Sequence, residues 1–420
     1  MSETQGVSVS DPTPEVQVAS PAEFNPLAAE FRANPHPAYA RLRAEDPVHW
    51  SPFLGFWVLT RYADCASVLR DGKRFSADPH DLAIYEALMQ SLGEDRPLGK
   101  MQRKWLLLLN PPDHTRLRTL VTKAFTPRVV ENLRPRIQAI VDGLLDKVQD
   151  AGAMDVIADL SYPLPVTVIA EMLGVPAEDC EMFKVWTTDL ARTLDPILSP
   201  EVLDAGDAAA IAFSDYFKAL VAKRRKDPQA DLFSALVVAE EQGDRLTEEE
   251  LIATAVLLFG AGHETTMNLI GNGLLALFRH PDQLAKLKAD PTLIPNAIEE
   301  FLRFDGPVQM TARTALADLD IGGKTIAKGQ QAILALTAAN RDPAQFTDPD
   351  RFDITRKDNT HIAFSHGIHY CLGAPLARVE AQLAIATLLR RFPHLHLATE
   401  DLEWREMVTL RGLKSLPITF

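Results

Sequence analysis

The chain has 420 residues, of which 46% are hydrophobic and 24% charged, a composition typical of a folded globular protein. Its net charge of −14 argues against nucleic-acid binding and against binding to an anionic membrane, because both surfaces attract basic proteins. No apolar run reaches the roughly 18 residues that a membrane span requires. The three cysteines lie far apart and form no CxxC pair, which favours a reducing cytoplasm over a disulfide scaffold.

The N-terminal part of the chain predicts a tail followed by a small sheet. Residues 1–22 are polar and acidic, and we expect a flexible tail there, with one domain over residues 23–420. Short segments with alternating apolar residues at 48–50 and 56–60 predict strands. Residues 76–110 are expected to form a long loop, and long loops inside compact domains are often functional.

Helical periodicity dominates the middle of the chain. Apolar residues recur at helical spacing in four segments, at 116–125, 134–148, 208–225 and 232–242. Thr247 and Glu250 form the pattern of a capping box, which predicts the start of a long helix running towards His280. Pro281 begins the next predicted helix, and residues 296–304 form another.

Strand and loop signals return towards the C-terminus. Residues 319–331 predict strands separated by glycine turns, and residues 340–356, which are rich in Asp, Pro and Arg, predict a long ordered loop. A further helix is expected from Ala374 to Arg390. We therefore predict a mainly α fold with a minor β region. The chain has no GxGxxG fingerprint and no P-loop, so nucleotide binding has no support.

Cys371 lies between two glycines in the segment AFSHGIHYCLGAPLAR, residues 363–378. Gly367 and Gly373 allow the backbone to fold closely around the sulfur with its N–H groups pointing inward, and Phe364 is placed to shield the sulfur from water. The N-terminal dipole of the following helix favours a thiolate. These features suit a metal ligand, although a small buried hydrophobic residue in a turn has the same spacing.

The pattern FxxGxxxCxG in this segment resembles the haem-thiolate loop of the cytochrome P450 family. Other family motifs follow in the expected order. These are HTRLR at 114–118, AGHETT at 261–266, the Glu300/Arg303 pair, and the 342–352 segment that contains DP and PDRF. The resemblance covers the chain from about Asn25 to the C-terminus and is closest to soluble bacterial members.

The resemblance implies a single domain with a long central helix over haem b, whose iron takes Cys371 as its axial thiolate. His114, Arg118, Arg313 and His369 match the positions that hold the two haem carboxylates. The remaining residues that the resemblance places at the cofactor are Phe364, Gly373 and Ala261. Taken singly, each of the four basic residues is an ordinary surface base. Two further basic residues, Arg116 and Arg378, are expected to face solvent or a partner protein.

In the long helix, Ala261 and Thr265 lie four residues apart on one face. A threonine hydroxyl that bonds back to the i−4 carbonyl opens a helix slightly, and the resemblance assigns Thr265 and Glu264 to proton delivery during O2 activation. The alternative is a core helix whose small residues lie where it crosses another helix.

Glu300 and Arg303 are expected to be a buried structural pair, whereas Glu131 and Arg134 repeat their spacing without the surrounding motif.

The predicted function is that of a cytoplasmic haem-thiolate monooxygenase, which inserts one oxygen atom of O2 into a hydrophobic small molecule by hydroxylation or epoxidation. The substrate pocket is expected at Gly260, Ala261, Val308 and Val408. Electrons from NAD(P)H are expected through a separate ferredoxin and ferredoxin reductase. The stretch 114–136 carries six Lys or Arg residues and one acid, Glu131, and suggests a docking patch, although a solvated helix face has the same composition.

Three alternatives stay open at this point. A peroxide-dependent haem-thiolate enzyme is the nearest, but such enzymes typically lack the pair formed here by Glu264 and Thr265. A haem-binding sensor without turnover needs no such pair either. A cysteine hydrolase that uses Cys371 and His369 requires the two side chains to face one cleft.

Overall fold

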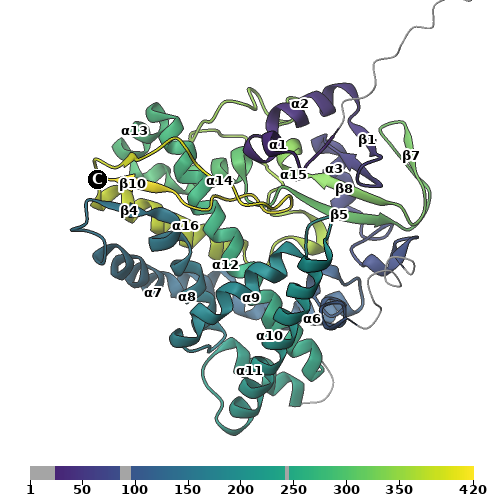
Figure 1. Cartoon of the computed structure of the whole chain (residues 1–420), viewed down its shortest axis with the longest axis horizontal. Coiled ribbons are helices and arrows are strands. Elements are labelled where there is room, and N and C mark those ends of the chain that lie inside the picture. The colour runs from purple at the N-terminus through teal and green to yellow at the C-terminus, as the bar shows by residue number, and fades with distance from the viewer. Residues whose placement is uncertain (1–23, 86–95, 242–245) are drawn as a thin grey trace, which may run out of the picture.

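The computed structural model describes residues 24–85, 96–241 and 246–420 (Figure 1). The fold is mainly helical with a minor sheet region, as the sequence predicts. The proposed N-terminal tail, residues 1–22, lies outside the described residues. The main helices are α1 (Ala29–Ala33), α2 (His36–Glu45), α3 (Tyr62–Arg70), α5 (Pro97–Gln102), α6 (Asp113–Thr122), α7 (Pro127–Asp146), α8 (Pro163–Met172), α9 (Cys180–Arg192), α10 (Pro200–Lys226), α11 (Leu232–Glu241), α12 (Glu248–Arg279), α13 (Pro281–Ala289), α14 (Ile294–Asp305), α15 (Leu336–Ala339) and α16 (Ala374–Arg391).

In the part of the chain that the structure describes, the strands form three small sheets. The largest has the order β1-β2-β8-β5-β3 and lies at the upper right of Figure 1, beside α2 and α3. β2 pairs with β8 in parallel and the other pairs in it are antiparallel. The strands are β1 (Val48–Ser51), β2 (Phe56–Leu59), β3 (Phe75–Ser76), β4 (Ala153–Asp155), β5 (Met310–Ala315), β6 (Leu319–Ile321), β7 (Lys324–Ile326), β8 (Gln331–Ala335), β9 (His396–Leu397) and β10 (Pro417–Thr419).

The long helix α12 runs through the centre of the molecule. Its start is the predicted capping box: the Thr247 hydroxyl accepts from the Glu250 N–H over 3.2 Å, and the Glu250 carboxylate accepts from the Thr247 N–H over 2.8 Å. Most of its residues are buried, and it packs against α8, α14 and α16. The main hydrophobic core surrounds it. α12 is therefore the element against which the site residues are placed.

Two predicted loops have different outcomes. Residues 340–356 contain neither helix nor strand and are held by hydrogen bonds to neighbouring elements, as predicted. The expectation of one loop over residues 76–110 is wrong, because α5 begins at Pro97 and buries Leu98 and Met101. Leu98 packs against α10 at Gly206, which a local pattern could not reveal. Residues 86–95 of that predicted loop lie outside the described residues.

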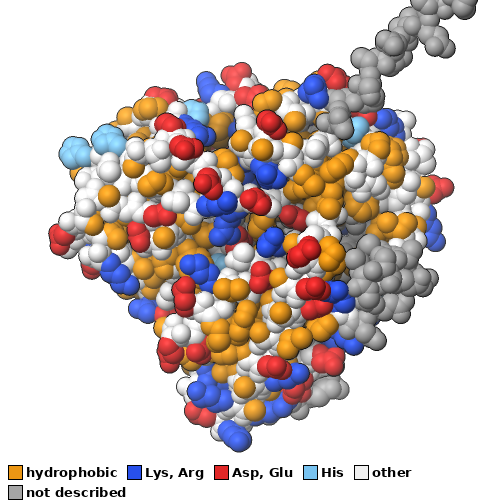
Figure 2. Space-filling view, in the orientation of Figure 1, with side chains coloured by type: hydrophobic (Ala, Val, Ile, Leu, Met, Phe, Trp, Pro, Cys, Tyr) orange, Lys and Arg blue, Asp and Glu red, His pale blue; other side chains and the backbone are white. Residues whose placement is uncertain are grey.

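The visible surface carries charges of both signs, interspersed with apolar side chains (Figure 2). None of the helices within the described ranges combines the length and hydropathy that crossing a bilayer demands.

Candidate active site

Cys371 lies in a tight loop directly before α16. Its backbone N–H donates to the Phe364 carbonyl over 2.9 Å. Gly367 has a φ of +68°, and a Cβ at this position would lie 2.5 Å from the Leu69 carbonyl oxygen. Only glycine therefore fits there, because any side chain would strain the backbone and collide with α3. The loop is held against the end of α3 in a single shape.

The surroundings of the Cys371 sulfur suit a bound cation. Burial raises the pKa of the thiol, while the backbone N–H groups of Gly373 and Ala374 and the charges of Arg118 and Arg378 act in the opposite direction. A coordinated metal ion adds the positive charge that holds such a sulfur as a thiolate. Gly373 has an ordinary φ of −81°, so its observed contribution is its N–H group.

Three basic side chains from distant elements come together beside this loop. His114 lies on α6, Arg313 on β5 and His369 in the cysteine loop, and the rings of His114 and His369 are 4.5 Å apart between centroids. Burial, with the charges of Arg118 and Arg313, lowers the pKa of His114 to about 4. Burial, with the charges of Arg313, His114 and Arg118, lowers the pKa of His369 to about 3.

This basic cluster fits a bound dianion. Within the described ranges, neither ring nitrogen of His114 has a hydrogen-bond partner. Arg313 is 7% exposed, burial lowers its pKa to about 10, and it donates to the Ala312 carbonyl over 2.7 Å and weakly to the Thr311 hydroxyl. Buried bases are normally paired with acids, and two carboxylates on one flat ligand would supply such acids. Arg118 points instead to the Tyr370 carbonyl, 2.6 Å away.

One short stretch in the middle of α12 keeps more solvent contact than the helix on either side of it. Gly260, Ala261 and Thr265 keep solvent contact, although the helix on both sides of them is buried. The Thr265 hydroxyl donates to the Ala261 carbonyl over 2.9 Å, which is the i−4 bond that the spacing predicts. Thr266 is buried and makes only a longer contact of 3.4 Å to the Gly262 carbonyl. The two adjacent threonines therefore differ in surroundings.

Glu264 is buried, at 2% exposure, and forms an ion pair with Arg405 from the C-terminal loop. Its other charged or titratable neighbour in the helix, His263, is also buried, with Nε2 3.7 Å from the carboxylate. Neither His263 nor Arg405 was among the site residues that the sequence predicted. Because 141 residues separate Glu264 and Arg405, no local pattern signals this pair.

Glu300 and Arg303 are fully buried on α14 and form a two-pronged ion pair with both distances at 2.8 Å. Arg303 also donates to the carbonyls of Asn340, Pro349 and Arg351. Glu300 accepts from the Asp353 N–H and from the side chains of Arg356 and Asn359. The pair thus ties α14 to the loop that precedes Cys371. By contrast, Glu131 and Arg134 form an exposed ion pair.

The neighbouring residue Glu299 connects α14 to α16 and to the segment before Cys371. It binds Arg378 of α16 with distances of 2.6 and 2.8 Å, and His361 at 3.1 Å. The guanidinium of Arg378 lies 4.6 Å from the centre of the Phe364 ring. The expectation that Arg378 faces solvent or a partner protein is therefore wrong. Arg116, given the same expectation, pairs with Glu250 and Asp113.

The predicted pocket residues divide between two clusters. Val308 packs with Ala191, Met407 and Leu410, an apolar group that joins the end of α9 to the C-terminal loop. Val408 points the other way, into a cluster near the N-terminal helices. The chain bends at Val408, and Met407 rather than Val408 lies beside Val308.

Comparison with known proteins agrees with this arrangement. Residues 55–412 match the family model for cytochrome P450. The chain belongs to the cytochrome P450 family. It is 46% identical over 395 residues to a biotin biosynthesis cytochrome P450 from Bacillus subtilis, covering 94% of this chain and 98% of the relative. It is 45% identical over 401 residues to a vitamin D(3) 25-hydroxylase from Pseudonocardia autotrophica, covering 94% and 95%.

Solved structures show the same fold. The crystal structure of P450BioI in complex with an acyl carrier protein ligated to hexadec-9Z-enoic acid superposes with a TM-score of 0.87 at 46% identity. The match covers 94% of this chain and all of that chain. As a cytochrome P450, the protein is an oxidoreductase of the monooxygenase type with a haem-thiolate cofactor. The cysteine loop and the basic cluster fit that group.

We predict that Arg303→Ala destabilises the protein by about 3–5 kcal/mol, because it leaves the Glu300 carboxylate buried without its main cation and three carbonyls without a donor. Urea unfolding and the haem content of purified protein measure the effect.

The matched control is Arg134→Ala in the exposed Glu131 pair, which should change the free energy of unfolding by no more than about 0.5 kcal/mol. Equal effects of the two substitutions would show that the buried pair has no special structural role.

Proposed function

We propose that this chain is a monooxygenase in which Cys371 ligates the haem iron and Thr265 and Glu264 deliver protons. It inserts one oxygen atom of O2 into a hydrophobic small molecule, by hydroxylation or epoxidation. The observation that carries the proposal is the position of Thr265. Its hydroxyl is bonded to the Ala261 carbonyl on a solvent-accessible stretch in the middle of α12, and the adjacent residue, Glu264, carries a buried carboxylate.

In this proposal, some residues of the chain hold the haem and others move protons. Cys371 would hold the iron, and His114, Arg313 and His369 would bind the carboxylates, with the charge of Arg118 beside them. Haem b, when bound, supplies the chemistry that activates O2. Phe364 and Ala261 would pack against the group, with Phe364 excluding water from the sulfur side.

Proton delivery rests on three groups of α12. The Thr265 hydroxyl donates its one proton to the Ala261 carbonyl, which fixes its oxygen and leaves that oxygen's lone pairs able to accept a hydrogen bond from a group or water that carries a proton. Glu264 can take a proton and pass it on, because a carboxyl is acceptor-only when ionised and a donor when protonated. A peroxide-dependent enzyme or a non-catalytic sensor needs neither group, so this pair favours a monooxygenase.

The apolar cluster of Ala191, Met407, Leu410 and Val308 favours a hydrophobic substrate. The names of similar proteins refer to hydrophobic molecules as well, namely vitamin D(3) and a long-chain acyl group on a carrier protein. These substrates are chemically diverse, and we propose only the class of hydrophobic small molecules for this chain.

A separate ferredoxin and ferredoxin reductase would supply electrons from NAD(P)H. The stretch 114–136 offers fewer basic side chains for docking than its sequence suggests, because Arg116, Arg134 and Arg136 form ion pairs with carboxylates of this chain. Lys123 and Arg128 are exposed and form no ion pair with the described residues. Both follow α6, which reaches the cysteine loop through Arg118, so they are suited to dock an acidic partner near Cys371.

The first test replaces the proposed proton donor. Thr265→Ala should lower the rate of product formation roughly 10²-fold, at the lower end of what a positioned proton-transfer group contributes. NADH consumption should continue, with its electrons recovered as hydrogen peroxide. Product and peroxide formed per NADH are the quantities to measure.

The neighbouring Thr266→Ala is the control, because Thr266 is buried and makes only a 3.4 Å contact. It should keep product formation close to that of the unchanged protein. Tight coupling in Thr265→Ala, or equal uncoupling in both variants, would assign proton delivery to another group.

The second test concerns the electron donor. The double variant Lys123→Glu/Arg128→Glu should slow ferredoxin-supported turnover at low ionic strength by about tenfold or more, and weaken its dependence on salt, because steering by charge is screened by ions.

A variant with the same change of net charge, Lys223→Glu/Lys226→Glu at the end of α10, provides the control. It should leave the rate with limiting ferredoxin within about twofold, since charge changes away from a docking site act weakly. Equal slowing by both pairs would mean that only overall charge matters.

A further inference from the structure

Glu299 accepts hydrogen bonds from both sides of the cysteine loop. Its carboxylate takes two from Arg378, which follows Cys371 in α16, over 2.6 and 2.8 Å, and one from His361, which precedes the loop, over 3.1 Å. The Nδ1 of His361 accepts from the Ala363 N–H over 3.2 Å, so the ring proton is assigned to Nε2, which donates it to Glu299. One carboxylate of α14 thus holds both ends of the segment that contains Cys371.

The guanidinium of Arg378 is fixed in place from several directions. Beside its two bonds to Glu299, its Nη1 donates to the Tyr370 hydroxyl over 3.3 Å, and its Cζ lies over the Phe364 ring, 4.6 Å from the ring centre. Phe364 in turn holds the cysteine, because its carbonyl accepts from the Cys371 N–H over 2.9 Å. The ion pair with Glu299 therefore orients the guanidinium against the residue that binds the cysteine backbone.

Two guanidinium charges act on the Cys371 sulfur, those of Arg118 and Arg378. Arg118 donates to the Tyr370 carbonyl and forms no ion pair with the described residues. Arg378, by contrast, is paired with Glu299, and the two side chains are 26% and 27% exposed. Because water screens such a pair only in part, the carboxylate cancels most of the positive charge that Arg378 presents to the sulfur.

Both partners of this ion pair stay charged throughout the physiological pH range. Burial acts to raise the pKa of Glu299, but the hydrogen bonds from Arg378 and His361 outweigh it and lower the pKa to about 2. The hydrogen bonds to Glu299 raise the pKa of Arg378 further above its usual range. The pair is therefore a fixed arrangement of charges beside the cysteine loop.

We propose that Glu299 is a positioning residue that lowers the reduction potential of the haem iron bound at Cys371. It does so by cancelling the charge of Arg378 and by holding the guanidinium against Phe364. Reduction adds one electron, and hence one negative charge, to the iron centre, and a nearby uncancelled cation stabilises that added charge. With the ion pair intact this stabilisation is weakened. The inference rests on the proposed ligation of the iron by Cys371.

The test is a spectroelectrochemical titration of the haem-loaded protein, which measures the midpoint potential of the ferric–ferrous couple without turnover. Glu299→Gln keeps the shape of the side chain and removes its charge, so it should raise the equilibrium constant for reduction by roughly threefold to tenfold, the effect of one partly screened charge. Arg378→Gln leaves the carboxylate uncancelled and should lower this constant by a similar factor. The double variant Glu299→Gln/Arg378→Gln removes both charges and should return close to the unchanged protein.

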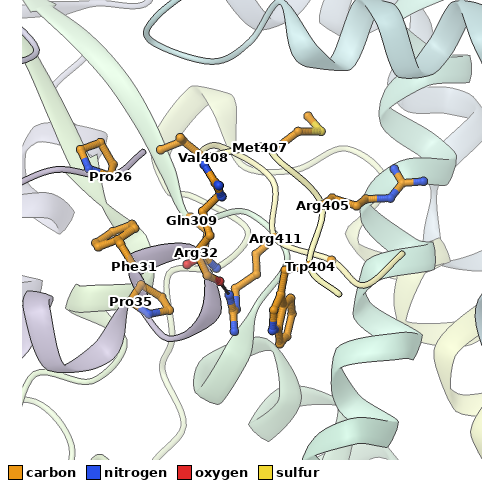
Figure 3. Close-up of a pocket in the computed structure, with 11 residues that line it drawn as sticks. Pro26, Phe31, Arg32, Pro35, Gln309, Trp404, Arg405, Met407, Val408 and Arg411 are labelled. Carbon is orange, nitrogen blue, oxygen red and sulfur yellow. Dashed lines mark hydrogen bonds between the residues drawn. The ribbon is translucent and has the colours of Figure 1, made fainter. Parts of the chain in front are cut away.

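Two substitutions provide the controls for a change of net charge. Arg391→Gln removes an arginine that is paired with Asp146 at the far end of α16, roughly 20 Å along the helix from Arg378. Arg32→Gln removes an arginine of α1 that lines the pocket between the N-terminal segment and the C-terminal loop (Figure 3). Both should leave the equilibrium constant for reduction within about twofold, because water and salt screen charges away from the cysteine loop.

An unchanged potential in Glu299→Gln, even with a loss of stability in urea, would overturn the inference and leave Glu299 a purely structural role. Shifts of the same sign in Glu299→Gln and Arg378→Gln, or a double variant that does not return towards the unchanged protein, would overturn it as well. If Glu299→Gln does not load haem, Arg378→Gln decides alone, and a potential that is not lowered there would overturn the inference.

The red-shifted Soret band of the reduced, CO-bound protein is recorded for every variant in the same cell. Its absence from the unchanged protein would refute ligation by Cys371, on which the proposed function rests. Its presence together with unmoved potentials would refute the role of Glu299 alone, so the two failures are distinguishable.

Discussion

The structure around the candidate site depends on charge pairs that are kept out of water on α14. Glu300 and Arg303 are fully buried, and together they bind the backbone of the loop that leads to Cys371. Removing either partner leaves an uncompensated buried charge, whereas the intact pair satisfies backbone groups that have no helix or strand to bind them. Glu299 adds a second anchor through Arg378 on α16. An irregular loop is thereby given the rigidity that a metal ligand requires.

The second organising feature is the contrast between two groups of buried polar side chains. His114, Arg313 and His369 form a basic cluster to which the described residues supply no carboxylate. Glu264, by contrast, is buried in an ion pair with Arg405. The first arrangement fits an anionic cofactor that brings its own charges, whereas the second is already paired within the chain.

Local patterns predicted the local features. The capping box at Thr247, the helix start at Pro281 and the i−4 bond of Thr265 each depend on residues within one turn of helix. The fold class followed from helical periodicity together with the family motifs. Pairs such as Glu264–Arg405, Glu299–Arg378 and Arg116–Glu250 could not be predicted, because 79 to 141 residues separate the partners and tertiary packing alone unites them. Tertiary packing also decides that Met407, and not the predicted Val408, lies beside Val308.

The central claim is that Cys371 supplies the thiolate, and it is tested most directly by the absorption spectrum of the reduced, CO-bound protein. Ligation by Cys371 predicts a Soret band at the red-shifted position typical of a thiolate ligand, and the loss of that band in Cys371→Ser. Replacement of either other cysteine, by Cys65→Ala or Cys180→Ser, should leave the band in place, because Cys65 is buried in a separate cluster and Cys180 begins α9. A red-shifted band that persists in Cys371→Ser would contradict the account.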